Sequence, residues 1–319
     1  MSTEGGRLSI LVPVRDEVES LEELVLQVVA ALEPHEAGPL IGTWELIFVD
    51  DGSVDGSWDV IQKLAAHDER VKGVSLRRNF GKAAALAAGL RESDGSLIAT
   101  MDGDLQDNPA ELPAMLARLD EPADLVTGYK RERQDPASKR VPSRVFNWAT
   151  SLVTGLKLHD HNCGLKVGWR EVFDNVPLYG EMHRFLASIS HAQGFRVIEQ
   201  EVHHRPRRHG RSKFGIERYA RGGLDLLTVL TLTRYNRRPA HLFGGLGLVV
   251  GVTGVAILLY LSALWAFRDQ AIGSRPLLLL GVLLVLLAVQ LASVGLLAEL
   301  LINQEAARED PQHHVIART

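Results

Sequence analysis

The chain has 319 residues, of which 46% are hydrophobic and 23% charged, and its formal net charge is −4. This length allows two domains, or one domain with an appended segment, and the single cysteine excludes an internal disulfide. Nucleic-acid binding is disfavoured, because the basic part of the chain lacks interleaved aromatic residues and any helix-turn-helix or zinc pattern.

The N-terminal segment lacks the pattern of a signal peptide. Its apolar stretch, residues 8–14, has only seven residues before Arg15, which is too short for an apolar region plus a cleavage site. We therefore expect the N-terminal part to stay in the cytosol. Cys163 fits the same reducing compartment, and we expect it to be a small buried residue.

Residues 1–128 alternate between short apolar runs and amphipathic helical stretches. The apolar runs expected to be strands are residues 8–14, 44–50, 71–76, 96–101 and 123–128. Between them, apolar residues repeat at helical spacing in 21–32, and residues 81–92 have high helix propensity. The alternation predicts an α/β fold with a mostly parallel sheet covered by helices.

Four polar motifs follow the predicted strands: PVRDE, DDGSVDGS, RRNFGK and DGDLQD. Ligands of such sheets bind beyond the carboxyl ends of the strands, so the four motifs are expected to face one crevice. DDGSVDGS is also ordinary turn and cap chemistry. A nucleotide-binding P-loop is excluded, because Leu76 and Ala83 stand where that motif needs Gly and Ser or Thr.

The most informative motif is the acidic segment that follows the fourth predicted strand. At a strand end, residues two positions apart project to the same side, so the carboxylates of Asp102 and Asp104 are expected to converge on one point, where two like charges need a cation. Oxygen ligands of this kind suit Mg²⁺ or Mn²⁺, which in turn binds a diphosphate. Asp107 or Asn108 is predicted to cap a helix that has Pro109 at its first position.

Charge is distributed unevenly along the chain. Residues 1–125 carry a net charge of −14, residues 126–240 carry +11, and the rest carries −1. This asymmetry suggests that the chain binds anions in two ways. The acidic part would bind one anion through a metal ion, and the basic part would bind another directly through Arg and Lys. Residues 205–218 contain six Lys or Arg and one Glu, which suits an anionic membrane surface. A general attraction to lipid therefore explains some of these charges, whereas GRSK, residues 210–213, also suits a phosphate.

The C-terminal part contains two predicted membrane spans. Residues 242–267 and 276–298 have no charge, and each is long enough as a helix to cross a hydrocarbon core of about 30 Å. Arginines before the first span favour a cytosolic N-terminal side, which would place both termini in the cytosol. Gly247 and Gly251 form a pair of small residues that could allow close helix packing.

Seven motifs followed by two apolar spans resemble the family 2 glycosyltransferases that load a sugar onto a polyprenyl phosphate. The resemblance is greatest to dolichyl-phosphate mannose synthases and bacterial polyprenyl-phosphate glucosyltransferases, and covers about residues 7–303. The motifs are VPVRDE, VDDGSVDGS, NFGKAAAL, MDGDLQD, HNCGLK, GEMHRF and RRHGRSKFG. The resemblance implies a GT-A fold, a nucleotide-sugar donor (UDP- or GDP-hexose), a divalent metal and an inverting transfer to undecaprenyl or dolichyl phosphate.

The resemblance also implies roles for individual residues. Metal ligation is implied for Asp102, Asp104 and Gln106, and catalysis for Asp104, Asp160 and Lys213. Donor binding is implied for Pro13, Arg15, Glu17, Asp50, Asp51, Lys82, Asp102, Arg207 and Ser212. Lipid-phosphate binding is implied for Lys130, Arg133, Lys139, Arg140 and Ser143, and contact with acceptor or sugar for Glu181, His183 and Arg184. Arg15 departs from the Tyr common at its place, Asp160 also fits a surface loop, and His183 also fits a packed or capping histidine.

Together these observations predict a membrane-anchored, metal-dependent enzyme on the cytosolic face of the inner membrane. The expected domains are a catalytic domain (1–214), an amphipathic juxtamembrane segment (215–240), two transmembrane helices (241–303, with spans at 242–267 and 276–301) and a cytosolic tail (304–319). The expected partners are the donor, the acceptor, the bilayer and further copies of the chain. Transfer to a glycan or glycolipid hydroxyl and a non-catalytic membrane adaptor remain alternatives. A processive synthase is disfavoured, because no Gln-x-x-Arg-Trp segment occurs.

Overall fold

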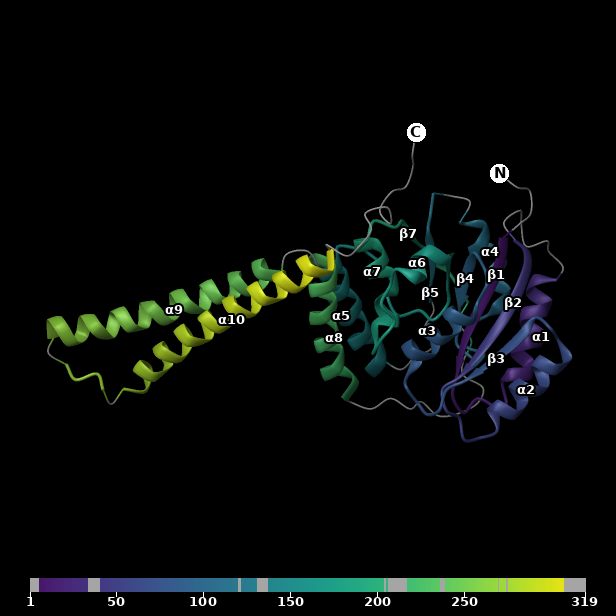
Figure 1. Ribbon diagram of the computed structural model, residues 1–319, viewed down its shortest axis with the longest axis horizontal. Helices are drawn as coiled ribbons and strands as arrows, with labels where there is room; N and C mark the ends of the chain where they lie inside the picture. Colours follow the sequence, from purple (N-terminus) through teal and green to yellow (C-terminus); the bar gives the residue numbers. More distant parts are fainter. Residues whose placement is uncertain are drawn as a thin grey trace. The chain divides into compact units, whose positions relative to one another are not determined.

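The computed structural model describes residues 6–33, 41–119, 122–130, 137–203, 205, 217–235, 239–268, 270–273 and 275–306. The chain forms two compact units, Met1–Thr233 and Arg234–Thr319. The first unit contains a seven-stranded sheet with helices, and the second contains a helical hairpin (Figure 1).

The sheet of the first unit has the strand order β3-β2-β1-β4-β6-β5-β7. Its strands are β1 (Gly6–Val14), β2 (Ile41–Asp50), β3 (Val71–Ser75), β4 (Leu97–Thr100), β5 (Leu125–Tyr129), β6 (Lys166–Trp169) and β7 (Val197–Glu201). Strands β1 to β4 pair in parallel, as do β5 and β7, whereas β6 is antiparallel to both β4 and β5. The prediction of a mostly parallel α/β sheet is therefore confirmed.

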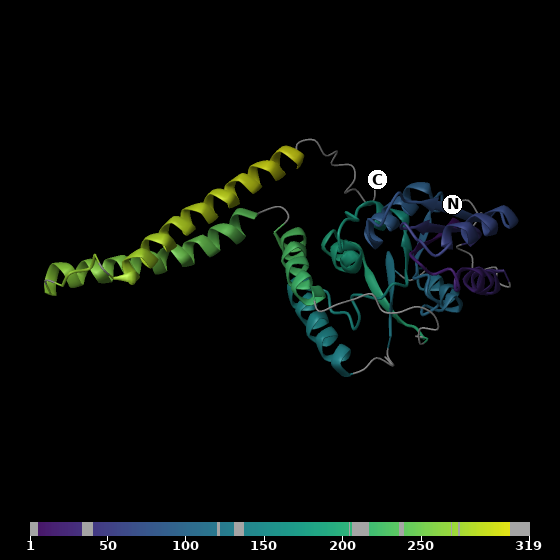
Figure 2. The same ribbon diagram turned by 90° about the horizontal axis from the view of Figure 1, so that it is seen from below.

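Helices lie on both faces of this sheet (Figures 1 and 2). They are α1 (Leu21–Leu32), α2 (Ser57–His67), α3 (Lys82–Glu92), η1 (Pro109–Glu111), α4 (Leu112–Ala117), α5 (Ala137–Thr154), α6 (Arg170–Asp174), η2 (Met182–Phe185), α7 (Leu186–Ala192) and α8 (Glu217–Arg234). One apolar cluster joins the sheet to α1, α2 and α4, and a second joins its other face to α3, α6 and α7. Central strands buried on both faces explain why their sequences are continuous apolar runs.

All five strands and both helices predicted from the sequence are present within a few residues of the expected bounds. The sequence did not reveal β6 and β7. The first has only four residues and begins with a lysine, so it lacks the apolar run that marked the other strands. This strand matters for function, because its antiparallel direction brings the preceding loop to the carboxyl end of β4.

The second unit consists of α9 (Pro239–Arg268) and α10 (Pro276–Ala306). Two helical segments within it, Pro239–Arg268 and Pro276–Ile302, are long and apolar enough to cross a membrane. Gly247 and Gly251 lie on the side of α9 that contacts α10, where an added Cβ would come within 3.0 Å of Ala288. The pair of small residues therefore allows close packing within the hairpin itself.

Candidate active site

The loops after β1 and β2 are bonded to each other. The backbone N–H of Asp16 donates to Ser53 Oγ at 2.9 Å, and Asp16 Oδ1 accepts from the backbone N–H of Val54 at 2.9 Å. Glu17 N–H donates to Ser57 Oγ at 3.1 Å. Pro13 lies beside Val49, one residue before the end of β1, and the exposed Arg15 follows that strand. These hydrogen bonds join the first two predicted motifs, PVRDE and DDGSVDGS, into one continuous surface, which we call the wall.

The two carboxylates after β2 accept hydrogen bonds from the backbone. Asp50 Oδ1 accepts from Ser53 N–H at 3.0 Å. Asp51 accepts from the N–H groups of Phe80 and Gly81, at 2.7 and 2.9 Å. Both carboxylates thus stabilise loops. The sequence of DDGSVDGS allowed this structural role as an alternative to nucleotide binding.

Gly52 is needed where the loops after β2 and β3 meet. Its φ is +72°, and an added Cβ would lie 2.7 to 2.8 Å from the backbone of Arg78 and Asn79. A side chain would therefore strain the backbone and push the two loops apart. This contact fixes the approach to α3, whose first residue is Lys82.

Lys82 reaches the acidic segment, where its ammonium pairs with the carboxylate of Asp102. Burial opposes the charged form of Lys82, but the charges of Asp102, Asp107 and Asp104 raise its pKa overall. Asp102 therefore holds the ammonium directly, and the charges of Asp104 and Asp107 act on it from the same segment.

The geometry of that segment differs from the prediction. Strand β4 ends at Thr100; Asp102 follows it without regular secondary structure and Asp104 lies in a turn, so the two residues do not continue an extended strand. The Asp102 side chain is about one third exposed. The buried Asp104 accepts from Gln106 N–H at 3.2 Å, and Leu105 between them has a φ of +60°. The prediction that Asp102 and Asp104 lie on the same side of an extended strand was therefore wrong. The irregular segment after β4 positions these carboxylates instead.

Asp107 is an ion-pair partner, and Asn108 is the helix cap. Asn108 Oδ1 accepts from Ala110 N–H at 3.2 Å at the start of η1, with Pro109 as the first helical residue. Asp107 instead contacts Lys130 Nζ at 3.1 Å and accepts from Asp102 N–H at 3.2 Å. Lys130, predicted to bind lipid phosphate, is thus held at the acidic turn. The charge of Asp107 raises the pKa of Lys130 against the effect of burial.

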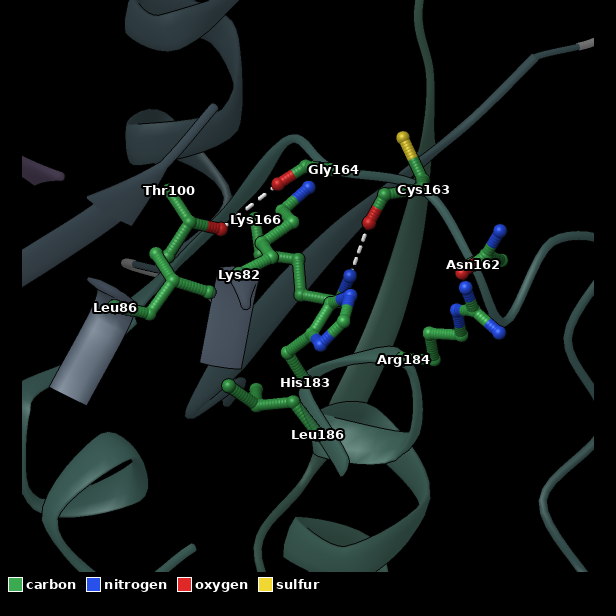
Figure 3. A pocket seen from close by; sticks show the side chains of 10 residues that line it. All are labelled: Lys82, Leu86, Thr100, Asn162, Cys163, Gly164, Lys166, His183, Arg184 and Leu186. Carbon is green, nitrogen blue, oxygen red and sulfur yellow. Dashed lines mark hydrogen bonds between the residues drawn. The ribbon is translucent and has the colours of Figure 1, made fainter. Parts of the chain in front are cut away.

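The loop before β6 closes over the acidic turn. A Cβ added to Gly164 would lie 2.8 Å from Asp102 Oδ2 and 2.9 Å from Asp107 Oδ2. Thr100 Oγ1 donates to the carbonyl of Gly164 at 2.8 Å (Figure 3). Only glycine fits this approach without moving a carboxylate. Cys163, just before it, is buried as predicted, and burial raises the pKa of its thiol to about 12.

The donor groups of the acidic turn fit a hard divalent cation. In the described part of the chain no group of three or more His, Cys, Asp or Glu could hold a metal by itself. Mg²⁺ commonly takes one or two protein carboxylates and completes its shell with substrate phosphates and water. The pairing of Lys82 with Asp102 shows that the turn attracts positive charge. Asp102 and Asp104 thus suit a cation that binds together with a diphosphate.

Asp160 is 3% exposed, so the surface-loop interpretation of this residue was wrong. Its Oδ1 accepts from Asn162 N–H at 3.1 Å, and its own N–H donates to Glu199 Oε1 at 3.1 Å. The neighbouring His161 is also buried, between Ser151 and Ser188, and burial lowers its pKa to about 4.

The predicted acceptor-contact residues lie in and beside η2. Arg184 Nη2 pairs with Glu181 Oε2 at 2.7 Å. His183 is packed, burial lowers its pKa to about 2, and its Nδ1 has no hydrogen-bond partner. His183 and Arg184 line a small cavity together with Lys82 and Lys166 (Figure 3). Sequence reasoning missed Lys166, although a single lysine in the apolar run CGLKVGW was a usable signal.

Several predicted residues lie outside what the structure describes. Arg133, Arg207, Ser212 and Lys213 are outside the described residues, and the side chains of Lys139, Arg140 and Ser143 are outside the described part of α5. Arg205 precedes one of these segments. Its N–H donates to the carbonyl of Gln106 at 3.2 Å, and its Nη2 donates to Asn108 Oδ1 at 2.8 Å. The basic segment 205–214 therefore begins beside the acidic turn.

Comparisons with known proteins identify the family of the chain. The family described as Glycosyl transferase family 2 matches residues 9–176. The "Dodecaprenyl-phosphate galacturonate synthase" of Rhizobium johnstonii is 40% identical over 98% of this chain and 92% of its own length. The "Undecaprenyl-phosphate 4-deoxy-4-formamido-L-arabinose transferase" of Pseudomonas aeruginosa is 35% identical over 92% of this chain and 84% of its own length.

Solved structures share the fold of the first unit. Glucosyl-3-phosphoglycerate synthase from Mycobacterium tuberculosis, in complex with Mn²⁺, UDP-glucose and glycerol 3-phosphate, has a TM-score of 0.52 and 20% identity. The match covers 71% of this chain and 79% of that protein. Mannosyl-3-phosphoglycerate synthase from Rubrobacter xylanophilus has a TM-score of 0.55 and 19% identity, over 71% of this chain and 73% of that protein.

Proposed function

The chain belongs to glycosyl transferase family 2, and we propose that it transfers a sugar from a nucleoside-diphosphate sugar to a polyprenyl phosphate, with inversion at the anomeric carbon. It is a glycosyltransferase with a GT-A fold, similar over nearly its whole length to enzymes of polyprenyl-phosphate sugars. One observation carries the proposal. Lys82 pairs with Asp102 in the acidic segment that follows β4, in a chain that also has two apolar helices long enough to cross a membrane.

The proposed donor is a UDP- or GDP-hexose. Its nucleoside would lie against the wall formed by Pro13, Arg15 and Glu17, next to Asp50 and Asp51. The complexes of glucosyl-3-phosphoglycerate synthase, a protein with the same fold, with Mn²⁺ and UDP-glucose support a nucleotide-sugar donor. In the same proposal Arg207, Ser212 and Lys213 contact the donor phosphates. The two relatives named above carry different sugars in their names, so they leave the sugar of this enzyme open.

The proposed cofactor is Mg²⁺ or Mn²⁺, held by Asp102, Asp104 and the side chain of Gln106. Such an ion neutralises the charge that develops on a nucleoside diphosphate as it leaves. Lys82 pairs with Asp102 at the same turn and is available to the diphosphate oxygens when the donor displaces that pair. The backbone of Gly164 lies against the carboxylates of Asp102 and Asp107, and because it has no side chain it does not displace them.

The acceptor oxygen attacks the anomeric carbon in line with the departing diphosphate. A phosphate monoester has its second pKa near 6, so it is mostly dianionic at pH 7 and needs no general base. We therefore assign Asp160 an orienting role. Basic residues between 130 and 143 neutralise the lipid phosphate, with Lys130, Arg133, Lys139, Arg140 and Ser143 as its contacts, and Glu181, His183 and Arg184 contact the acceptor or the sugar.

Membrane topology is part of the same proposal. Residues 1–214 form the catalytic domain, 215–240 a juxtamembrane segment, 241–303 two spans and 304–319 a tail, with the catalytic domain and both termini on the cytosolic face of the inner membrane. A reporter fused after Thr319 should then be labelled in the cytosol, and one inserted near Gln270 should be labelled outside. Reversed labelling of the two reporters would contradict this orientation.

Donor binding is tested directly by a thermal-shift panel on the full-length protein in detergent. UDP, GDP and their sugars are added with and without Mn²⁺. A ligand that binds only the folded state raises its stability by about 2.7 kcal/mol at 100 times its Kd. We expect one nucleotide series to raise the Tm only when Mn²⁺ is present, and Asp104→Asn to remove that shift. No shift with any nucleotide would contradict the proposed function.

A further inference from the structure

A buried lysine without a carboxylate partner stands beside the candidate active site. Lys166 begins β6 and is 3% exposed. Among the described residues its ammonium has one contact, the carbonyl of Cys163 (Figure 3). Burying an ammonium is costly unless an opposite charge and hydrogen bonds compensate it. A lysine that serves only the fold would be expected to have a carboxylate partner.

Lys166 lines a cavity of about 20 Å³, which has room for about one water or one substituent of a ligand. Its polar lining consists of Lys82, Thr100, Asn162, Lys166, His183 and Arg184. Figure 3 shows these side chains around one space, between the end of β4, the start of β6 and the start of η2. The Nδ1 atom of His183 is buried there without a hydrogen-bond partner. The cavity therefore offers a cation and an unsatisfied nitrogen close together.

The charges around this cavity favour an anion. Lys82 and Arg184 are paired with Asp102 and Glu181, respectively. Lys166 is left with a carbonyl alone, and burial lowers its pKa even though the charges of Asp160 and Asp102 act on it from a distance. A ligand carboxylate would give Lys166 the oppositely charged partner that it lacks, and its second oxygen would accept a hydrogen bond from His183 when Nδ1 carries the proton.

The position of the cavity indicates which part of a substrate enters it. Through Lys82 it adjoins Asp102, where we place the donor diphosphate, so the sugar attached to that diphosphate is the nearest group. The acceptor phosphate is placed by the proposed function at the basic residues between 130 and 143, none of which lines this cavity. A substituent on the sugar is small enough to enter.

We propose that the cavity formed by Lys166 and His183 is a subsite for a carboxylate on the donor sugar, so that the enzyme uses a nucleoside-diphosphate uronic acid. This inference rests on the proposed function and adds the class of sugar to it. A site that hydrogen-bonds a charged group discriminates strongly against a substrate that lacks the group, because its buried polar atoms are then left unpaired.

The wild-type enzyme alone provides the first test. Binding of UDP, UDP-glucose, UDP-glucuronate, UDP-galactose and UDP-galacturonate, and of GDP-mannose and GDP-mannuronate, is measured by calorimetry on the full-length protein with Mn²⁺. We expect one uronate to bind about 10- to 100-fold more tightly than its matching hexose, the difference expected for hydrogen bonds to a charged group. Equal affinity for each uronate and its hexose would overturn the inference and leave the proposed function intact. Binding of none of these ligands would overturn both.

The second test assigns the preference to the cavity. Lys166→Met is expected to remove the uronate preference while the affinity for the free nucleoside diphosphate stays unchanged, which also shows that the variant is folded. Lys157→Met, which changes an exposed lysine of the preceding segment, is the matched control and should keep the preference. A preference that survives Lys166→Met would overturn the inference. So would a variant that raises the KM for polyprenyl phosphate alone, because the cavity would then serve the acceptor phosphate.

Discussion

Two groups of carboxylates lie at the same edge of the sheet, and different kinds of partner stabilise their charges. Asp50 and Asp51 accept hydrogen bonds from backbone N–H groups of their own and a neighbouring loop. Asp102 and Asp107 are paired with the ammonium groups of Lys82 and Lys130. A backbone N–H cannot leave without unfolding the loop, whereas a lysine side chain can rotate away. The first group thus shapes the site, and the second can exchange its partners for a metal ion and a phosphate.

Changing the acidic turn should have the largest effect on transfer. Asp102→Asn or Asp104→Asn removes a charged metal ligand worth several kcal/mol in the transition state, so we expect a loss of at least about 10³-fold. The Tm without ligand should stay close to that of the wild type. Turnover with saturating donor, acceptor and Mn²⁺ is the measurement, and Asp59→Asn on the exposed surface of α2 is the control. Near wild-type turnover by either variant would contradict the assignment of Asp102 and Asp104 as metal ligands.

The next largest effect is expected from the glycine that faces the turn. In Gly164→Ala the new Cβ would meet Asp102 and Asp107 within 3 Å, so one carboxylate must move. A displacement of about 1 Å near the reacting groups can reduce the rate by about 10². Gly223→Ala, at a helical position with open space around it, is the control and should have no such effect. Equal rates for the two variants would mean that the contact with Gly164 does not position the turn.

Asp160→Asn should reduce transfer less than Asp104→Asn, because an orienting group contributes less than the metal that stabilises the leaving group. Its rate should vary little between pH 7 and 9, where a phosphate acceptor is already ionised. Initial rates of both variants at several pH values provide the test. If Asp160→Asn were the more damaged variant, or if it regained activity steeply with rising pH, the acceptor would be a hydroxyl and Asp160 its base.

Asp51→Ala should act mainly on stability. It leaves the N–H of Phe80 without its acceptor, which costs about 1–3 kcal/mol when such a group is buried, whereas Gly81 N–H keeps a hydrogen bond to Asn79 Oδ1. We expect a lower Tm than for Asp102→Asn, measured on both full-length variants without ligand. The contrast between the two carboxylate groups would be lost if Asp102→Asn were the less stable variant.

The sequence predicted those parts of the fold and site that depend on local patterns. Continuous apolar runs marked β1 to β5, and the position of the polar motifs after these strands brought the loops to one edge. Details that depend on tertiary contacts could not be obtained in this way. The pairing of Asp107 with Lys130 joins residues 23 positions apart, and the approach of Gly164 to Asp102 requires the antiparallel β6. Periodicity contains no signal for either contact.

The proposed transfer to a lipid phosphate is tested most directly by comparing two acceptors that differ only in the phosphate. The full-length enzyme is incubated with Mn²⁺, its labelled nucleotide sugar, and either a polyprenyl phosphate or the corresponding polyprenol. We expect a labelled glycosyl phospholipid from the phosphate alone, with the anomeric configuration opposite to that of the donor. Transfer to the polyprenol at a similar rate, or a product that retains the donor configuration, would contradict the proposed reaction.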